Sequence, residues 1–206
     1  MSDIFPCRRS PDRSFQRYRL RHTAGFRVNR TTGALTGLAG SPYPAGNVPF
    51  SVAVDPLGRF VYTMTGSGVA GIYGYAIDPT SGVLTPLTGS PFPFPTDNRI
   101  VIHPSGKFLY NLDRPGSPTS QINAYAIADS GALTLLAGSP FVDPSMPESG
   151  AFDPTGRFLY VTVEIGGGPT AGGVKVYQVD PVSGALSAVS TTPAQIATNP
   201  TSIAVR

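Results

Sequence analysis

One short phrase occurs three times in the chain at nearly constant spacing. It reads DPLGRFVYT at residues 55–63, HPSGKFLYN at 103–111 and DPTGRFLYV at 153–161. The glycines that align in the three copies, Gly58, Gly106 and Gly156, are 48 and 50 residues apart. A period near 50 residues is typical of solenoids and propellers, in which each repeat is one supersecondary unit. The repeat therefore limits the chain to an architecture of stacked, similar units.

The repeated phrase has the composition of a tight turn that leads into a strand. Asp accepts hydrogen bonds from the backbone ahead of it, Pro fixes φ near −65°, and Gly adopts the positive φ that lets the chain return. The aromatic residue and the Tyr that follow are two residues apart and lie on one face of the next strand. Each copy is therefore predicted to form the same hairpin.

The remainder of each repeat predicts three further features. Before the turn lies a short apolar strand, at 51–54, 100–102, 150–152 and again at 202–205. After the second strand come a third and a fourth, and their junction carries the phrase SGVL or SGAL (TGAL in an earlier copy at 28–38). Val, Ile, Tyr, Phe and Thr dominate these segments, and Pro or Gly interrupts every candidate helix. The sequence predicts an all-β fold of four-stranded antiparallel blades, a β-propeller.

Charge is distributed unevenly along the chain. The first 30 residues hold eight arginines and two aspartates, whereas the remainder holds seven basic and ten acidic residues. We interpret residues 1–25 as a disordered leader outside the fold, and the acidic remainder argues against nucleic-acid binding. The single Cys7 excludes an internal disulfide and a cysteine metal cluster. No signal peptide or membrane span is visible, so the chain as written reads as cytoplasmic, although its compartment stays open.

The repeat resembles that of the β-propeller lactonase family, which includes 6-phosphogluconolactonase-like and carboxymuconate-lactonizing-like proteins with YVTN-type repeats. The resemblance rests on GALTxLAGSPF, on SVAVDPxGRFLYV and on the strand ending in YxID, and it extends over about residues 25–206. It implies a seven-bladed ring and hydrolysis of a sugar lactone of the 6-phosphogluconolactone type, without a cofactor or a metal.

A seven-bladed ring with this period needs about 350 residues. The chain supplies about four blades, three of them complete. They are predicted at 49–88, 98–137 and 148–190, with a partial blade at 26–38 and the first strand of another at 199–206. We expect an open arc of the larger ring, with a closed four-bladed ring as the alternative. The change near Thr23 from Arg-rich sequence to regular repeat suggests a truncated or mis-started reading frame.

The loops on one side of a propeller differ between blades and are the expected place for a ligand. The resemblance implies Glu164 as a catalytic residue, because the family carries a Glu after this strand. Arg99 and Arg114 are candidates to assist it, and the acidic residues expected to bind substrate are Asp97, Asp113, Asp143 and Glu148. The family's Arg-His pair before the first strand is not matched, since Asn98–Arg99 and Glu148–Ser149 occupy those positions.

Other polar residues are expected to be structural. His103 stands where Asp55 and Asp153 stand in the other copies, so we interpret it as a turn residue and not as a general base. The run of three glycines at 166–168 lacks the Lys-Ser/Thr of a phosphate-binding loop. No Asp-x-Asp-x-Asp spacing supports Ca²⁺.

Two functions stay open at this point. The first is a lactonase-family hydrolase acting on a small-molecule lactone, in a chain whose activity the missing histidine and missing blades leave unsettled. The second is a non-catalytic propeller segment that binds a protein or associates with itself through exposed blade edges.

Overall fold

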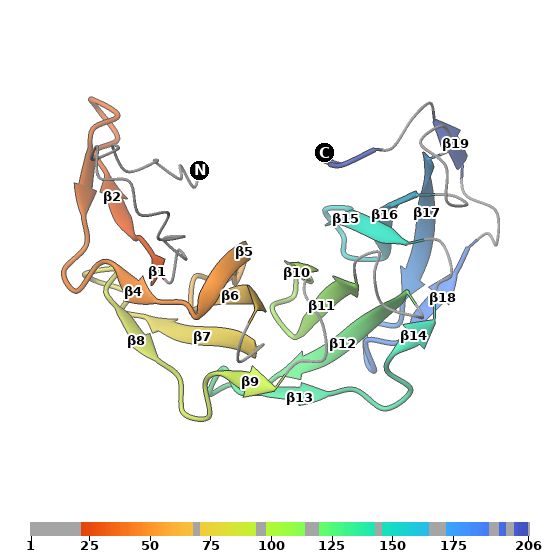
Figure 1. Cartoon of the computed structure of the whole chain (residues 1–206), viewed down its shortest axis with the longest axis horizontal. Helices are drawn as coiled ribbons and strands as arrows, with labels where there is room; N and C mark the ends of the chain where they lie inside the picture. The colour runs from red at the N-terminus through yellow and green to blue at the C-terminus, as the bar shows by residue number, and fades with distance from the viewer. Residues whose placement is uncertain are drawn as a thin grey trace, which may run out of the picture.

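The computed structural model describes residues 22–67, 71–93, 98–113, 120–142, 146–164, 172–189, 194–196 and 200–205. These residues form strands and turns, and none of them lies in a helix. Accordingly, the described part of the chain contains no helix with the length and apolar character to cross a membrane. Figure 1 shows the strands arranged as an open arc, with the first and last described strands on the two sides of its opening.

Three similar antiparallel sheets make up most of the arc, and each follows the strand order predicted from the repeat. The first blade contains β5 (Asn47–Val54), β6 (Phe60–Ser67), β7 (Gly71–Ile77), β8 (Leu84–Pro86) and β9 (Phe92–Pro93). The second contains β10 (Asn98–Ile102), β11 (Phe108–Asp113), β12 (Gln121–Ile127), β13 (Leu133–Leu135) and β14 (Phe141–Val142). The third contains β15 (Pro147–Phe152), β16 (Phe158–Glu164), β17 (Gly172–Val179), β18 (Leu186–Ala188) and β19 (Ala194–Ile196). The prediction of an all-β propeller arc is confirmed.

The beginning of the described chain forms two small sheets. β2 (Phe26–Val28) pairs with β3 (Leu35–Gly37), and β1 (His22–Thr23) pairs with β4 (Tyr43–Pro44). β2 and β3 correspond to the third and fourth strands of a blade, which agrees with the partial blade expected at 26–38. Residues 200–205 form no strand, unlike the first strand predicted there. No strand of the described chain pairs with them, and an isolated segment has no ladder of hydrogen bonds to define it.

The sequence did not predict the fifth short strand of each blade. β9, β14 and β19 each pair with the third strand of their own sheet. In the first two blades this strand follows a GSP phrase whose Ser hydroxyl accepts the backbone N–H of the third strand. The Ser90 Oγ lies 3.0 Å from Gly74 N, and the Ser139 Oγ lies 2.9 Å from Ala124 N. The repeated serine therefore links the segment before the fifth strand to the third strand of the same blade.

The hairpin turns have the geometry expected from the repeated phrase. The N–H groups of Gly58, Gly106 and Gly156 donate to the carbonyl three residues earlier, at 2.8, 2.8 and 2.9 Å. The three glycines have φ of 72°, 68° and 74°, a region that L-residues rarely adopt. In the third copy the Asp153 carboxylate accepts the N–H of Phe158 at 2.7 Å. The turn prediction is confirmed in all three blades.

Alternate residues of each second strand pack into different hydrophobic clusters. In β11, Leu109 packs with the first blade, whereas Tyr110 and Leu112 pack with the third blade. All three are fully buried. The core therefore lies between neighbouring blades, and one strand contributes to two of these interfaces because its side chains alternate.

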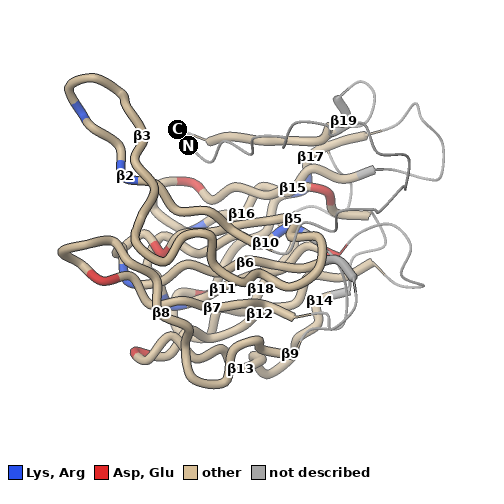
Figure 2. Tube along the Cα trace, turned by 60° about the vertical axis from the view of Figure 1, so that its left-hand side comes forward, with Lys and Arg blue, Asp and Glu red and all other residues tan. Residues whose placement is uncertain are grey.

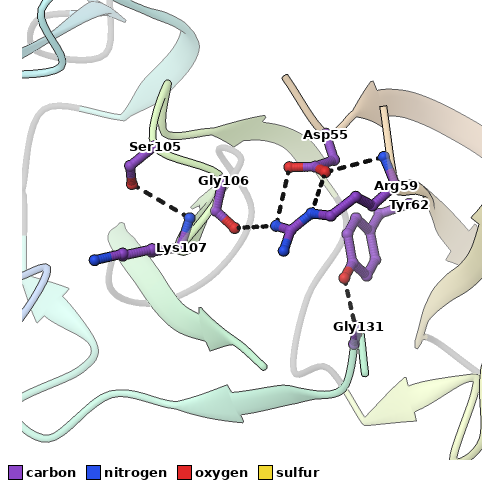
Figure 3. Close-up of polar contacts among 7 residues, drawn as sticks. All are labelled: Asp55, Arg59, Tyr62, Ser105, Gly106, Lys107 and Gly131. Carbon is purple, nitrogen blue, oxygen red and sulfur yellow. Dashed lines mark hydrogen bonds and ion pairs between the residues drawn. The ribbon is translucent and has the colours of Figure 1, made fainter. Parts of the chain in front are cut away.

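Polar bonds between blades accompany the apolar packing (Figure 3). The Tyr62 hydroxyl donates to Gly131 O at 2.7 Å, and the equivalent Tyr110 hydroxyl donates to Gly184 O at 2.8 Å. On the turns, Arg59 is paired with Asp55 at 2.8 Å and donates to Gly106 O at 3.0 Å. The first blade thus donates hydrogen bonds to two backbone carbonyls of the second blade, and the second blade donates through Tyr110 to a carbonyl of the third.

The buried tyrosines give the fold a predicted sensitivity to alkaline pH. Burial raises the pKa of Tyr62 and Tyr110 above that of an exposed tyrosine, and it raises the pKa of Tyr125 to about 12. Below about pH 10, the usual pKa of a tyrosine, both the folded and the unfolded chain hold these protons. Above it the unfolded chain releases them first, so the free energy of unfolding should fall as pH rises. Denaturant titrations at several alkaline pH values would measure this fall, and a constant unfolding free energy throughout would contradict the burial described.

Candidate functional site

The candidate residues lie at one edge of the blades, where the first strand of each begins and the second strand ends. β5, β10 and β15 are the first strands, and Figure 1 shows them on the concave side of the arc. At this edge Asn98 pairs with Asp113, and Ser149 pairs with Thr162. Charged residues lie mostly near the strand ends, whereas the middles of the strands consist mainly of other residue types (Figure 2). We call this end of the strands the concave edge, and the described candidates there are Arg99, Asp113, Glu148 and Glu164.

Asp113 is the most enclosed of the predicted site residues. It is the last residue of β11 and only 1% exposed. Two residues earlier on the same face, Asn111 is fully buried, and its side-chain amide lies 3.2 Å from the Met64 sulfur. The Asn123 amide, 3.5 Å from the Asn111 oxygen, extends this polar row onto β12. Asp113 thus lies at the end of a face of β11 that also carries a buried polar side chain at Asn111.

Arg99 lies on the opposite face of the same blade from Asp113. It is directly opposite Leu112 in the β10–β11 pair, and Leu112 packs toward the third blade. Since opposed residues share a face and neighbours alternate, Arg99 faces the third blade while Asp113 faces the first. Arg99 is exposed, in contrast to Asp113. The structure therefore does not place this predicted pair on one face.

The third blade, toward which Arg99 faces, carries the acidic candidates Glu148 and Glu164. Glu148 is half-buried and falls in a β-bulge, because the register of β15 shifts between Pro147 and Ser149. Bulges redirect side chains and are frequent beside active sites. Glu164 ends β16, opposite Gly172 of β17. The remaining candidates, Asp97, Arg114 and Asp143, lie outside the described residues.

Sequence reasoning missed the buried amides beneath Asp113. The signal was present in FLYNLD at 108–113, where two polar residues stand two positions apart in an otherwise apolar strand. This spacing puts Asn111 and Asp113 on one face. Thr63, the equivalent of Asn111 in the first blade, is also buried, and its hydroxyl has no hydrogen-bond partner within the described residues.

His103 behaves as a turn residue, in agreement with its place in the repeat. Its Nδ1 accepts the Ser105 N–H at 3.1 Å, and its Nε2 lies 2.8 Å from Gly156 O. Both ring nitrogens are thus engaged on the edge away from the candidate site. A cavity of 310 Å³ beside the ring is lined by Gly156 and Arg157 of the third blade. His103 contacts the carbonyl of Gly156, as Arg59 contacts the carbonyl of Gly106 one repeat earlier.

Among the residues described, no group of three or more His, Cys, Asp and Glu side chains is arranged to hold a metal ion. Of the charged candidates whose side chains the structure describes at the concave edge, Asp113 and Glu148 carry carboxylates and Arg99 carries a guanidinium group.

Comparison with known families identifies the fold. The sequence profile described as "Lactonase, 7-bladed beta-propeller" matches residues 94–205, which is more than half of the chain. The chain belongs to this family. No match was found among curated protein sequences.

Solved structures of similar shape carry lactonase names. Putative 6-phosphogluconolactonases from Bacteroides fragilis and Bacteroides uniformis align with TM-scores of 0.64 and 0.60 at 17% and 16% identity, over 88% and 82% of this chain. A periplasmic gluconolactonase from Pseudomonas aeruginosa aligns with a TM-score of 0.57 at 17% identity, over 88% of this chain. The alignments cover 50%, 50% and 53% of those proteins, so this lactonase-family chain spans about half their length. At these identities the likeness shows a shared fold.

Proposed function

We propose that this lactonase-family chain supplies part of a site that hydrolyses a small sugar lactone, with 6-phosphogluconolactone as the first candidate. The observation that carries the proposal is the family match over residues 94–205, a segment of the sequence that contains all seven charged candidates. The names of the similar solved structures agree with a sugar lactone. The positions that correspond to the family's Arg-His pair hold Asn98–Arg99 and Glu148–Ser149, and the chemistry proposed for this chain uses carboxylates.

Lactone hydrolysis needs a base to activate water and a donor to stabilise the oxyanion. We assign the first role to Glu164, which takes a proton from water as the water oxygen attacks the ring carbonyl carbon. Arg99 and Arg114 stabilise the negative charge that develops on the carbonyl oxygen. Collapse of the intermediate breaks the ring C–O bond, and the leaving alkoxide takes a proton to give the hydroxy acid.

The other acidic candidates are proposed to bind the substrate. Asp113 follows Asn111 on the same face of β11, and its carboxylate is suited to accept hydrogen bonds from sugar hydroxyls. Glu148 projects from a bulge at the beginning of β15, and we assign it the same role. Asp97 and Asp143 complete the proposed set.

Activity of the purified chain tests the proposal directly. We expect acid release from 6-phosphogluconolactone above the uncatalysed rate, and at least a roughly 100-fold lower kcat/KM for Glu164→Gln, because the base is lost. Asp129→Asn is the matched control, since Asp129 is exposed on a turn at the opposite edge and should leave activity unchanged. Hydrolysis no faster than background, or an unaffected Glu164→Gln variant, would overturn the assignment.

Substrate choice can be tested with Arg99. If Arg99 binds a phosphate group, Arg99→Gln should weaken turnover of 6-phosphogluconolactone more than that of gluconolactone, because a guanidinium forms its strongest hydrogen bonds to anions. An equal loss for the two substrates would assign Arg99 to the oxyanion alone.

We also propose that the chain associates with a further propeller segment through its exposed blade edges. Exposed apolar residues at the beginning of the arc support this second function, among them Phe26 at 44% and Val28 at 55%. Exposed apolar surface of this kind often marks an interaction site.

A further inference from the structure

The two ends of the arc carry the two halves of the interface that joins its blades internally. At each internal junction, an aromatic pair on the second strand of one blade packs against the third and fourth strands of the next. Phe108, for example, lies within contact of the turn at Gly184, where an added Cβ would lie 2.7 Å from its ring. The Tyr110 hydroxyl then donates to the carbonyl of that same glycine at 2.8 Å. The first and second blades make the same contacts through Phe60, Tyr62 and Gly131.

The β2–β3 hairpin presents the receiving half of this interface without an occupant among the described residues. We call Phe26, Val28, Leu35 and the turn at Gly33 the leading patch. Phe26 corresponds in register to Tyr125, which is 5% exposed, whereas Phe26 is 44% exposed. Val28 corresponds to Ile127, which is 8% exposed, against 55% for Val28. Figure 2 shows this hairpin projecting away from the stacked blades.

The turn of the hairpin is shaped like the turns that receive a tyrosine elsewhere in the chain. Gly33 has φ of 74° and its N–H donates to Asn29 O at 2.8 Å, as Gly184 donates to Asp180 O at 2.9 Å. A Cβ at Gly33 would meet no atom within 4 Å, whereas one at Gly184 would meet the Phe108 ring. The turn therefore has the conformation that receives an aromatic pair, and no described side chain packs on it.

The third blade presents the other half of the interface, the surface that carries the aromatic pair and the tyrosine hydroxyl that donates at each internal junction. We call Phe158, Tyr160 and Val189 the trailing patch. Phe158 and Tyr160 are half-buried, whereas Phe108 and Tyr110 at the same places in the second blade are 5% and 0% exposed. Val189 is 58% exposed, and the equivalent Leu87 is 9% exposed. The trailing patch thus repeats the surface that covers each internal hairpin.

Net charge differs between the segments that contain the two patches. Residues 22–46 include Arg27 and Arg30 and no acidic residue, although Arg27 lies on the opposite face from Phe26 and Val28 and donates to Ser81 O of the first blade. Residues 147–189 include four acidic and two basic residues. Opposite net charge steers two copies toward each other and is not part of the contact itself.

We propose that a second copy of this chain docks its trailing patch onto the leading patch, with Tyr160 donating to Gly33 O of the other copy. Two copies related by a two-fold axis then make two such contacts, because each copy has one patch of each kind. This inference rests on the proposed self-association. It specifies the two surfaces in contact, a second copy as the partner, and the hydrogen bond that aligns them.

The experiment measures the mass of the full chain in solution, alone and in mixtures. The wild type should show twice the mass of one chain. Val28→Glu and Val189→Glu should each be monomeric, because either change places a charge in both contacts of the dimer. Both residues are more than half exposed in the single chain, so the folded monomer should keep its thermal stability. Val182→Glu, at an 88% exposed position outside both patches, is the control that should leave the dimer intact.

Mixing the two monomeric variants decides the orientation. One intact contact remains in the mixed pair, so a 1:1 mixture of Val28→Glu and Val189→Glu should recover a heterodimer. A wild-type chain that is monomeric at all concentrations would overturn both the self-association and this inference. A dimer that Val28→Glu dissociates and Val189→Glu does not, or the reverse, would preserve self-association and overturn the head-to-tail contact, as would a mixture that stays monomeric.

Discussion

Replacing Gly156 by alanine is expected to lower the free energy of unfolding by about 3 kcal/mol. Its φ of 74° costs an L-residue roughly 1–2 kcal/mol. The new Cβ would also lie 2.5 Å from His103 Nε2, and overpacking of this kind typically costs about 1–3 kcal/mol. Phe108 and Phe152 pack against the His103 ring with ring centroids 5.8 and 5.1 Å away, so the ring can move away from the new Cβ only toward the adjoining cavity, and its bond to Gly156 O would be disturbed.

Gly58→Ala is the matched control for this prediction. Gly58 occupies the same place in the same turn with φ of 72°, but a Cβ there would meet no atom within 4 Å. Gly58→Ala should therefore show only the cost of a positive φ for alanine, which lowers the free energy of unfolding by about 1 kcal/mol. Denaturant unfolding of the two variants followed by circular dichroism would measure the difference. Equal destabilisation would mean that the contact between the second and third blades adds nothing at Gly156.

The second large effect is expected for Tyr110→Ala, which should lower the free energy of unfolding by about 4 kcal/mol. Tyr110 is fully buried, and its ring centroid lies 5.6 Å from that of Phe152. Large-to-small changes at buried aromatic residues cost about 3–5 kcal/mol. The change also leaves Gly184 O without its hydroxyl donor, whereas Tyr110→Phe removes the hydroxyl alone and should cost about 1–2 kcal/mol.

Tyr160→Ala provides the comparison in the next repeat. Tyr160 is half-buried, and none of the described hydrogen bonds involves its hydroxyl. Tyr160→Ala should lower the free energy of unfolding by about 1 kcal/mol when it is measured at low protein concentration, where self-association does not contribute. A cost equal to that of Tyr110→Ala would show that Tyr160 is already covered in the single chain, and would also argue against the trailing patch.

The architecture could be predicted from the sequence because local chemistry specifies each part of the blade. The Asp-Pro-x-Gly turn forms through its own side chain, its own proline and a glycine with positive φ, all within four residues. The alternation in FVYTM and FLYNL determines which side chains face each neighbouring blade. The short outer strands β9, β14 and β19 were missed because they are only two or three residues long and depend on pairing with a distant strand.

The candidate site was less predictable, since its arrangement depends on register. Sequence reasoning grouped Arg99 with Asp113 because both precede or follow loops at one edge. The register places them on opposite faces of the second blade, a difference of one residue that no local signal reveals. Likewise, the bulge that redirects Glu148 arises from pairing between β15 and β16 and has no sequence marker beyond Pro147. The roles of the seven candidates stay predictions.

Because β11 divides its side chains between two interfaces, the length of that strand cannot change. Deleting one residue within it would turn Leu109 toward the third blade and Tyr110 toward the first, so both junctions would fail together. Insertions between strands carry no such penalty. The turn glycines are separated by 48 residues in one interval and 50 in the next, and the two extra residues are accommodated outside the second strands. New loops around the concave edge can therefore arise in one blade at a time, while the strands beneath them keep their pairing.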